Sequence, residues 1–274
     1  MKAFAQIIFY LFISTLFVSS CSVNPYAKTN KIYRKNAKAF AKEIGRKELP
    51  PIEAAGVKNS TEFAGTVNFN LRKPNFVIIH HTAQKACEQT LKTFTIGKTQ
   101  VSAHYVICKD GTVYHMLNDY LRAWHGGAAK WGNVTDINSV SLGIELDNDG
   151  FEPFSEDQIN SLLGLLAVLK KNYNIPPSNF IGHSDIAPGR KVDPNKYFPW
   201  KRLADAGYGM WYDDFLEVAD STFNPQIALR LIGYDIKDTL AAITAFKLHF
   251  IQTDLNTTLT KLDSNVMNNL SKKY

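Results

Sequence analysis

Hydrophobic and polar positions from residue 76 onward form a pattern that predicts strands interleaved with helices. The run FVII at 76–79 is apolar throughout, which is typical of a short strand buried on both faces. Two more strand patterns, at 103–107 and 112–117, flank Lys109-Asp110-Gly111, a turn sequence that predicts a hairpin. Residues 140–146 predict a further strand, so the expected sheet has at least one antiparallel pair.

A long amphipathic helix is predicted after these strands. Ser155 fits the N-cap of a capping box in which Gln158 reaches back, and apolar residues then recur at helical spacing as far as Tyr173. A short strand at 180–181 and a helix at 200–206 follow along the chain. Strands interleaved with helices, including a tight hairpin, predict an α/β fold with a mixed β-sheet flanked by helices.

The pattern changes again at residues 213–224, and three short amphipathic segments follow. They span 225–231, 236–250 and 264–271. A helical bundle of about fifty residues is marginal in size when it stands alone, because it buries too little apolar surface. We therefore expect this small C-terminal bundle to pack on the main domain.

Residues 1–20 carry the pattern of a secretory signal peptide. Lys2 supplies the positive charge, roughly sixteen mostly apolar residues follow, and the stretch ends in small residues. The alternative, a transmembrane anchor, needs a longer apolar segment. Val18-Ser19-Ser20-Cys21 resembles a bacterial lipobox, which predicts that Cys21 is lipidated and begins the mature protein. Ser22 in place of an acidic residue favours sorting to the outer membrane, facing the periplasm.

The segment after the lipobox differs in texture from the rest of the chain. Residues 21–55 are polar and rich in lysine, and we interpret them as a lipidated tether with a partly ordered collar. One short helical stretch is predicted at 34–44, before the stop signal Pro50-Pro51. This segment therefore links the predicted anchor to the folded part of the chain.

The composition is that of a chain with a packed core. Hydrophobic residues make up 45% and charged residues 20%, which excludes disordered, collagen-like and coiled-coil classes. A net charge of +6 favours polyanionic partners such as an acidic cell-wall polymer, although much of the lysine lies near the chain ends. Three cysteines are too few for a disulfide scaffold. Cys87 and Cys108 can either pair or remain as two buried thiols.

Two of the seven histidines stand where ligands gather in a sheet. His80 and His183 each lie directly at the C-terminal end of a short apolar strand, and such strand ends open onto loops. Asp193 lies ten residues beyond His183. Two imidazoles and one carboxylate leave a fourth tetrahedral position for water, the layout of catalytic rather than structural zinc. Histidine and aspartate are also common in loops that bind no metal, so spacing alone leaves both interpretations open.

Three separate segments of the chain stand out: IHHTA at 79–83, GIE at 143–145 and GHSDIAPGRKVDP at 182–194. In this order they resemble the type 2 N-acetylmuramoyl-L-alanine amidases. That family is related to phage lysozyme-type amidases and to animal peptidoglycan recognition proteins. The similarity covers residues 74–213 and implies the fold of that family.

The C-terminal third extends the resemblance. FPW at 198–200 and GYGMW at 207–211 are similar to an outer-membrane lipoprotein of the same family. LIGYD at 231–235, AFKLHF at 245–250 and the last residues resemble a divergent peptidoglycan-binding helical module. The resemblance thus implies four parts: a lipoprotein signal peptide (1–20), a lipidated tether and collar (21–55), a zinc amidase domain (56–213) and a helical peptidoglycan-binding-like module (214–274).

The resemblance also implies which residues hold the metal. Carried over position by position, it makes His80, His183 and Asp193 the ligands of a Zn²⁺ ion. Relatives mostly place the first histidine of such a pair on the metal, so His81 is not expected to bind it. Some relatives have cysteine where this chain has Asp193, and the harder oxygen ligand still suits zinc.

Two further residues take catalytic roles through the resemblance. Glu145 at a strand end matches the catalytic carboxylate, with a solvated surface charge as the alternative. Lys191 matches a lysine that faces the reacting carbonyl, with a loop lysine in solvent as the alternative. One departure concerns Ala103, because several phage relatives carry a tyrosine there. A tyrosine that assists the oxyanion is therefore not expected in this chain.

Substrate contacts are expected from a glycine-rich loop. Trp124-His125-Gly126-Gly127 resembles the loop with which the family contacts the cell wall, so Trp124 and His125 are candidate substrate contacts. The alternative is a glycine turn with an incidental histidine. His104 could contact substrate, hold a ligand or Glu145, or belong to the core. His115 and His249 are expected to be structural.

The resemblance implies a zinc-dependent amidase that cuts the amide bond between N-acetylmuramic acid and L-alanine. Expected partners are peptidoglycan or muropeptides and, through the lipid anchor, a membrane. Nucleic acid is not expected, and the chain is predicted to be a monomer. Two rival functions remain: a non-catalytic peptidoglycan-binding protein of the same fold, and a zinc peptidase that acts on the stem peptide.

Overall fold

The computed structural model describes residues 24–45, 71 and 73–274 in two units that divide between Phe69 and Asn70. The predicted signal peptide and Cys21 lie outside the described residues. In the first unit the described part is one helix, α2 (Ala27–Ile44), with no buried residue. It begins earlier than the helix expected at 34–44. Among the described helices, none combines the length and apolar character needed to cross a bilayer.

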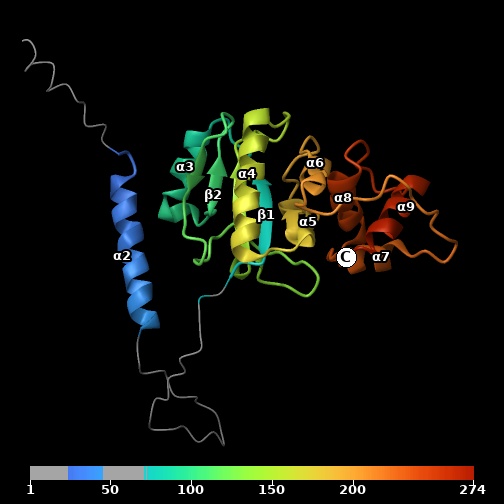
Figure 1. Ribbon diagram of the computed structural model, residues 1–274, viewed down its shortest axis with the longest axis horizontal. Helices are drawn as coiled ribbons and strands as arrows, with labels where there is room; N and C mark the ends of the chain where they lie inside the picture. The colour runs from blue at the N-terminus through green and yellow to red at the C-terminus, as the bar shows by residue number, and fades with distance from the viewer. Residues whose placement is uncertain (1–23, 46–70, 72) are drawn as a thin grey trace, which may run out of the picture. The chain divides into compact units, whose positions relative to one another are not determined.

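The second unit is built on a five-stranded sheet (Figure 1). Its strands are β1 (Phe76–His81), β2 (Tyr105–Ile107), β3 (Val113–His115), β4 (Ser141–Leu146) and β5 (Phe180–Gly182). Their order is β3-β2-β4-β1-β5, and only the β2–β3 hairpin is antiparallel. Every residue of β1, an interior strand between β4 and β5, is buried, as its continuous apolar run predicts. The predicted mixed sheet flanked by helices is confirmed.

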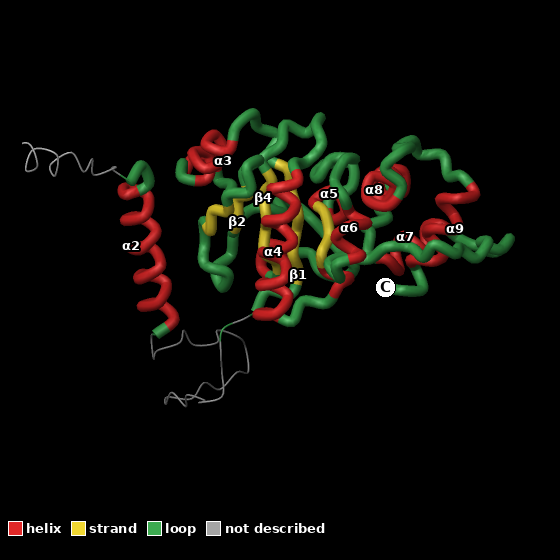
Figure 2. The backbone as a smooth tube through the Cα atoms, turned by 45° about the horizontal axis from the view of Figure 1, so that its top comes forward, coloured by secondary structure: helices red, strands yellow, loops and turns green. Residues whose placement is uncertain are grey.

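The helix α4 (Glu156–Tyr173) covers one face of this sheet (Figure 2). Ser155 caps it by accepting the backbone N–H of Gln158, and Asn174 ends it in the left-handed conformation. The Gln158 side chain does not reach back as in a capping box. It donates instead to the carbonyls of Ile107 (2.9 Å) and Asp147 (3.2 Å), because both are buried and need a donor.

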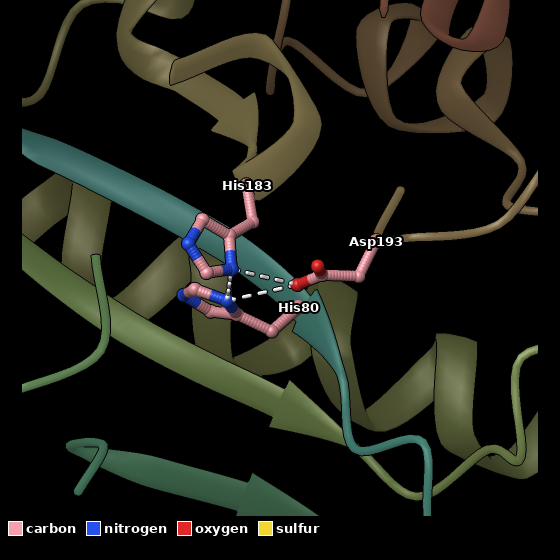
Figure 3. A group of neighbouring side chains, drawn as sticks. All are labelled: His80, His183 and Asp193. Atoms are coloured by element: carbon pink, nitrogen blue, oxygen red, sulfur yellow. Dashed lines mark hydrogen bonds and ion pairs between the residues drawn. The ribbon is translucent and has the colours of Figure 1, made fainter. Parts of the chain in front are cut away.

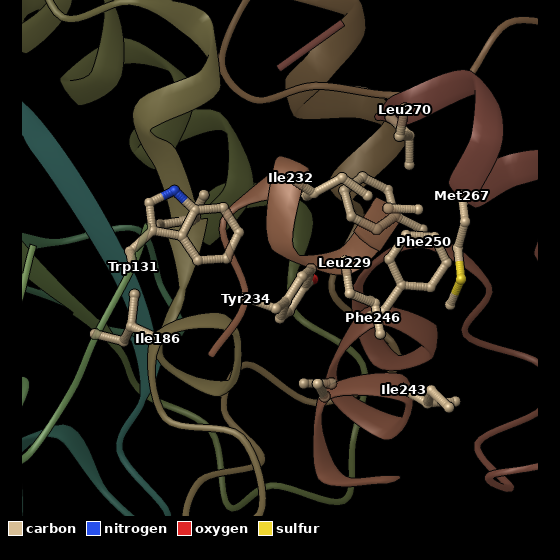
Figure 4. Packing of buried hydrophobic residues seen from close by; sticks show 14 of the residues in the cluster. Trp131, Ile186, Leu229, Ile232, Tyr234, Ile243, Phe246, Phe250, Met267 and Leu270 are labelled. Carbon is tan, nitrogen blue, oxygen red and sulfur yellow. The ribbon is translucent and has the colours of Figure 1, made fainter. Parts of the chain in front are cut away.

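The opposite face of the sheet carries the C-terminal helices. These are α7 (Pro225–Ile232), α8 (Thr239–Phe250) and α9 (Lys261–Leu270). Their buried residues join Ile78 of β1 and Ile181 of β5 in one hydrophobic cluster, which Figure 4 shows around Trp131 and Phe246. As expected, the bundle packs on the main domain. The apolar face of the sheet and the small bundle thus bury each other's hydrophobic residues in one shared core.

Shorter elements connect these layers. They are α3 (Cys87–Phe94), α5 (His183–Ile186), α6 (Trp200–Asp205) and three 3₁₀ turns, η1 (Gly97–Thr99), η2 (Ile137–Ser139) and η3 (Pro177–Asn179). A disulfide between Cys87 and Cys108 ties the start of α3 to the residue after β2, with 5.4 Å between the two Cα atoms. Of the two interpretations that the sequence left open, pairing is the one present in the structure.

Candidate active site

The sheet topology brings the predicted metal ligands to one edge. β1 is parallel to both β4 and β5, so the C-terminal ends of these three strands lie together. His80 near the end of β1 faces Glu145 of β4 in the register, and His183 follows directly after β5. Asp193 returns to this edge because its carbonyl accepts the backbone N–H of Ser184 (2.8 Å).

Three ligand atoms converge at this edge (Figure 3). His80 Nδ1 lies 2.9 Å from His183 Nδ1 and 3.1 Å from Asp193 Oδ2. His183 Nδ1 lies 2.9 Å from the same carboxylate oxygen. All three side chains are buried, and no other group of this kind occurs within the described part of the chain. Two neutral imidazole lone pairs cannot satisfy each other, so this arrangement calls for a cation or shared protons.

The outward nitrogens of both rings are held by one loop. His80 Nε2 pairs with His125 Nδ1 at 3.0 Å, and His183 Nε2 donates to the Gly126 carbonyl at 3.1 Å. Asn138 Oδ1 accepts the backbone N–H groups of His125 (3.1 Å) and Gly126 (2.8 Å). These contacts leave each Nδ1 free to face the centre of the cluster.

Electrostatics fix the protonation of the cluster. Burial and the adjacent His183 lower the pKa of His80 to about 4. Burial opposes ionisation of Asp193, yet the close contacts with the His183 and His80 rings overcome this effect and hold its pKa far below the usual range. At neutral pH the His80 ring is therefore neutral and Asp193 is ionised, which are the states that bind a metal.

A pocket of about 390 Å³ opens over the cluster and contains the predicted catalytic residues. Glu145 and Lys191 both line it. Burial raises the pKa of Glu145 to about 8, with Asp193 adding to the shift and Lys191 opposing it. Glu145 Oε2 is buried and has no hydrogen-bond partner among the described residues. Glu145 can therefore exchange a proton with a molecule in the pocket.

The predicted substrate contacts divide between pocket and core. Trp124 lines the pocket with 52% of its surface exposed. His125 also borders the pocket, but it is buried behind His80, with its other ring nitrogen 3.2 Å from Ser141 Oγ. The ring lies directly over Gly143, where a Cβ would approach His125 Cγ to 2.5 Å. The loop therefore presents Trp124 to the pocket and His125 to a metal-ligand candidate.

His104 lies in the core and does not line the pocket. Its Nδ1 accepts the Gly143 backbone N–H (3.0 Å), and its Nε2 donates to the Leu121 carbonyl (2.9 Å). Both ring nitrogens are thus used by backbone groups, which fits the core alternative rather than a substrate contact. His81 lines the pocket but lies outside the ligand cluster. Ala103, which precedes His104, is fully buried and lacks the hydroxyl that a tyrosine at this position would supply.

Arg190, for which the sequence analysis predicts no role, borders the pocket beside Lys191. Its Nη2 donates to the carbonyls of Gly126 (2.7 Å) and Ala128 (2.8 Å). Arg190 therefore clamps the same loop that holds the two histidines. Its position next to Lys191 in the sequence could have marked it as a pocket residue. The direction of its guanidinium could not be predicted, because it depends on Gly126, which lies 64 residues away in the sequence.

Comparisons with known proteins identify relatives of this chain. The family model described as N-acetylmuramoyl-L-alanine amidase (Amidase_2) matches residues 70–196. The amidase AmiD of Escherichia coli K12 is 32% identical over 212 residues, which cover 66% of this chain and 76% of AmiD. The anhydro-muramyl amidase AmpD of Haemophilus influenzae is 38% identical over 108 residues, which cover 39% of this chain and 59% of AmpD.

Solved structures agree with the sequence relatives. E. coli AmiD in complex with its substrate superposes with a TM-score of 0.67 at 28% identity, covering 77% of this chain and 94% of AmiD. AmpDh3 of Pseudomonas aeruginosa superposes with a TM-score of 0.69 at 27% identity, covering 80% of this chain and 99% of AmpDh3. Sequence and structure thus both match such amidases over most of their length, and the chain belongs to the N-acetylmuramoyl-L-alanine amidase family.

Proposed function

We propose that this protein is a zinc-dependent N-acetylmuramoyl-L-alanine amidase that hydrolyses the bond between N-acetylmuramic acid and L-alanine in peptidoglycan or muropeptides. The observation that carries the proposal is the convergence of His80 Nδ1, His183 Nδ1 and Asp193 Oδ2 beneath a pocket that also contains Glu145. The complex of E. coli AmiD with anhydro-N-acetylmuramic acid-L-Ala-D-γ-Glu-L-Lys supports this substrate class.

The ligand atoms fit zinc. Bonds of 2.0–2.1 Å in a tetrahedral site place neighbouring ligand atoms about 3.3 Å apart. In this chain the three separations are 2.9, 2.9 and 3.1 Å, so shifts of a few tenths of an ångström would admit the ion. Three protein ligands leave one position for water or substrate, as in catalytic zinc sites.

Glu145 and Lys191 divide the remaining chemistry. Zinc, when bound, supplies a Lewis acid that polarises the scissile carbonyl and acidifies water. A cation held by His80, His183 and Asp193 would lower the raised pKa of Glu145 and favour its ionised form. The unpaired Oε2 of Glu145 then accepts the proton of the attacking water and later delivers it to the leaving alanine amine. Lys191 borders the same pocket, where its ammonium stabilises the negative charge that develops on the carbonyl oxygen.

The proposed location is the periplasmic side of the outer membrane. Cys21 in the lipobox supplies the anchor, and a bacterial lipoprotein carries several acyl chains, which hold more firmly than one. The resemblance of residues 214–274 to a peptidoglycan-binding module supports contact with the wall. Replacing Cys21 with Ala should release the protein from membranes or block its processing. Unchanged fractionation would contradict the anchor.

Digestion of purified sacculi and of anhydro-muropeptides, followed by mass spectrometry of the products, tests the function. Release of intact stem peptides, leaving glycan strands free of peptide, shows an amidase, whereas cleaved stem peptides show a peptidase. Retention on sacculi without any release shows a binding protein. Chelation should abolish release and added zinc should restore it. His80→Ala should lose the zinc, while the matched neighbour His81→Ala should keep it.

A further inference from the structure

The helix α2 presents two chemically different faces. Tyr33, Ala37, Phe40 and Ile44 recur at helical spacing and form one apolar stripe, which we call the apolar face. Phe40 and Ile44 expose 57% and 78% of their surfaces. No residue of α2 is buried, so the described part of the first unit does not cover this stripe.

The other side of α2 is strongly basic. At 100° per residue the cations gather roughly opposite the apolar face. They are Lys28, Lys31, Arg34, Lys35, Lys38 and Lys42, which we call the basic face. The first turn of the helix contains no acidic residue. The helix is thus basic and amphipathic, with low overall hydrophobicity, which is the composition of helices that lie in a membrane interface.

We propose that α2 lies flat on an anionic phospholipid surface. The apolar face enters the boundary between headgroups and acyl chains, and the lysines extend their stems to the phosphates. An acidic wall polymer would neutralise the basic face but would leave Tyr33, Phe40 and Ile44 in water. A protein groove would cover the apolar face without using the dense positive charge. An anionic bilayer satisfies both faces at once.

Binding to vesicles tests the proposal without the lipid anchor and without the amidase reaction. The mature chain with Cys21→Ser cannot be lipidated, and sedimentation with vesicles measures its partition. We expect binding to phosphatidylethanolamine–phosphatidylglycerol vesicles, weaker binding at high salt, and little binding to phosphatidylcholine. Each cation near an anionic surface contributes about fivefold to the partition. Lys31→Gln/Lys35→Gln/Lys38→Gln should therefore weaken binding about 100-fold.

Two further variants separate the helix from general basic charge. Tyr33→Gln/Phe40→Gln keeps every cation and should weaken binding at least tenfold, since buried apolar groups contribute strongly. Lys98→Gln/Lys237→Gln/Lys261→Gln removes the same charge from exposed positions of the second unit and should bind as the parent does. Equal losses in both lysine triples, or no loss in the α2 variants, would overturn the proposal. Loss of sacculus binding alone would favour the wall polymer and also overturn it.

Activity on soluble muropeptides should be the same in all these variants, because none of them touches the pocket. If the parent protein were inactive on soluble muropeptides, the amidase function would be contradicted. The vesicle experiment would still test the membrane proposal, because it does not depend on activity.

A separate observation concerns the loop behind the metal-ligand candidates. His80 Nε2 faces His125 Nδ1 at 3.0 Å, and His125 Nε2 faces Ser141 Oγ at 3.2 Å. Ser141 Oγ donates to the Ile137 carbonyl at 2.6 Å. The hydroxyl proton is thus committed to the carbonyl, so Ser141 accepts from His125, and His125 accepts from His80. This chain of donors leaves the lone pair of His80 on Nδ1.

The geometry points to His125 as a positioning residue for His80, a role that rests on the proposed zinc site. Removing an outer partner of a metal-bound histidine typically lowers metal affinity 10–100-fold. His125→Leu should therefore weaken zinc binding by about that factor, measured by competition with a chromophoric chelator. His125→Asn should restore most of the affinity, because its amide oxygen can accept the same proton. His115→Leu, at an exposed histidine paired with Asp119, is the matched control.

Zinc affinity distinguishes positioning from simple packing. A packing role would lower the melting temperature of His125→Leu and His125→Asn alike while the folded protein kept its zinc affinity. Parental zinc affinity in folded His125→Leu would overturn the proposal. Absence of zinc binding in the parent would instead contradict the proposed function.

Discussion

The short helix α5 separates two buried clusters of histidine and aspartate. One cluster lies under the pocket, and the other lies in the hydrophobic core. On one side His183 joins His80 and Asp193 under the pocket, where three acceptor atoms point at one another. On the other side Asp185 pairs with His249, 2.7 Å between Oδ2 and Nδ1, and accepts the Tyr234 hydroxyl at 2.7 Å. We call these the open cluster and the closed cluster.

The difference lies in how donors and acceptors are matched. In the closed cluster each carboxylate oxygen of Asp185 receives a donor, including the Gly182 backbone N–H at 2.7 Å, and His249 Nε2 is the one ring nitrogen of this cluster that is buried without a partner among the described residues. The His249 ring is sandwiched between Trp200 and Phe250, with ring centroids 3.8 and 4.0 Å away. In the open cluster the acceptors converge without enough protons to satisfy them. Histidine and aspartate therefore mark a site only where their lone pairs meet at a pocket.

Deleting residues 214–274 should have the largest effect, because it opens the closed cluster and uncovers the sheet. The deletion removes His249 and Tyr234 and exposes the apolar face that contains Ile78 and Ile181. We expect loss of the cooperative unfolding transition and of activity on sacculi and soluble muropeptides alike. Circular dichroism and both assays check this. A folded, active truncated protein would show that the two clusters are energetically independent.

His183→Ala should abolish activity while leaving a folded protein. The change removes one ligand of the open cluster and leaves Asp185 and His249 paired on the other side of α5. Zinc content by atomic absorption should fall to background, and turnover should fall with it. Stoichiometric zinc in the purified variant would contradict the ligand assignment.

Glu145→Gln should reduce turnover while keeping zinc. Glutamine preserves the shape of the side chain but cannot take a proton from water, and general acid–base groups contribute on the order of 10²–10⁴-fold. We therefore expect kcat on a soluble muropeptide to fall by about that factor, with little change in KM. A kcat within about threefold of the parent would mean that another group in the open cluster's pocket acts as the base.

His249→Leu should affect stability and spare turnover. It removes a hydrogen-bond partner of the buried Asp185 carboxylate, and depriving a buried acceptor of its donor typically costs about 1–3 kcal/mol. Urea unfolding should show this loss in the free energy of unfolding. The exposed His115 provides the control: its partner Asp119 is largely buried but keeps the Tyr105 and Tyr173 hydroxyls as donors, so His115→Leu should cost less than about 1 kcal/mol. Similar costs for both variants would contradict the closed cluster's structural role.

Local patterns predicted the strands and the open cluster well. His80 and His183 stood out because each follows an apolar strand, and the parallel order of β1, β4 and β5 then brings such strand ends together. The closed cluster could not be predicted in this way. Asp185 and His249 are separated by 64 residues, and their pairing depends on how α8 packs against α5.

The direction of side chains within loops also could not be predicted from the sequence. The sequence placed His125 in a loop near the substrate, but spacing does not tell which side of a loop a ring faces. The structure turns it toward His80. Likewise Gln158 satisfies carbonyls of two strands that no local motif connects to it. Such directions follow from the need to pair buried polar groups, which arises only once the chain has folded.

The bare backbone at Gly143 has a consequence for how sequences of this kind can diverge. The His125 ring occupies the space that a side chain at position 143 would take, since a Cβ there would approach its Cγ to 2.5 Å. A methyl group at 143 is therefore compatible only with a smaller residue at 125. Two positions eighteen residues apart, on a loop and on a strand, are thus linked in one direction: a change at 143 is expected only together with a change at 125.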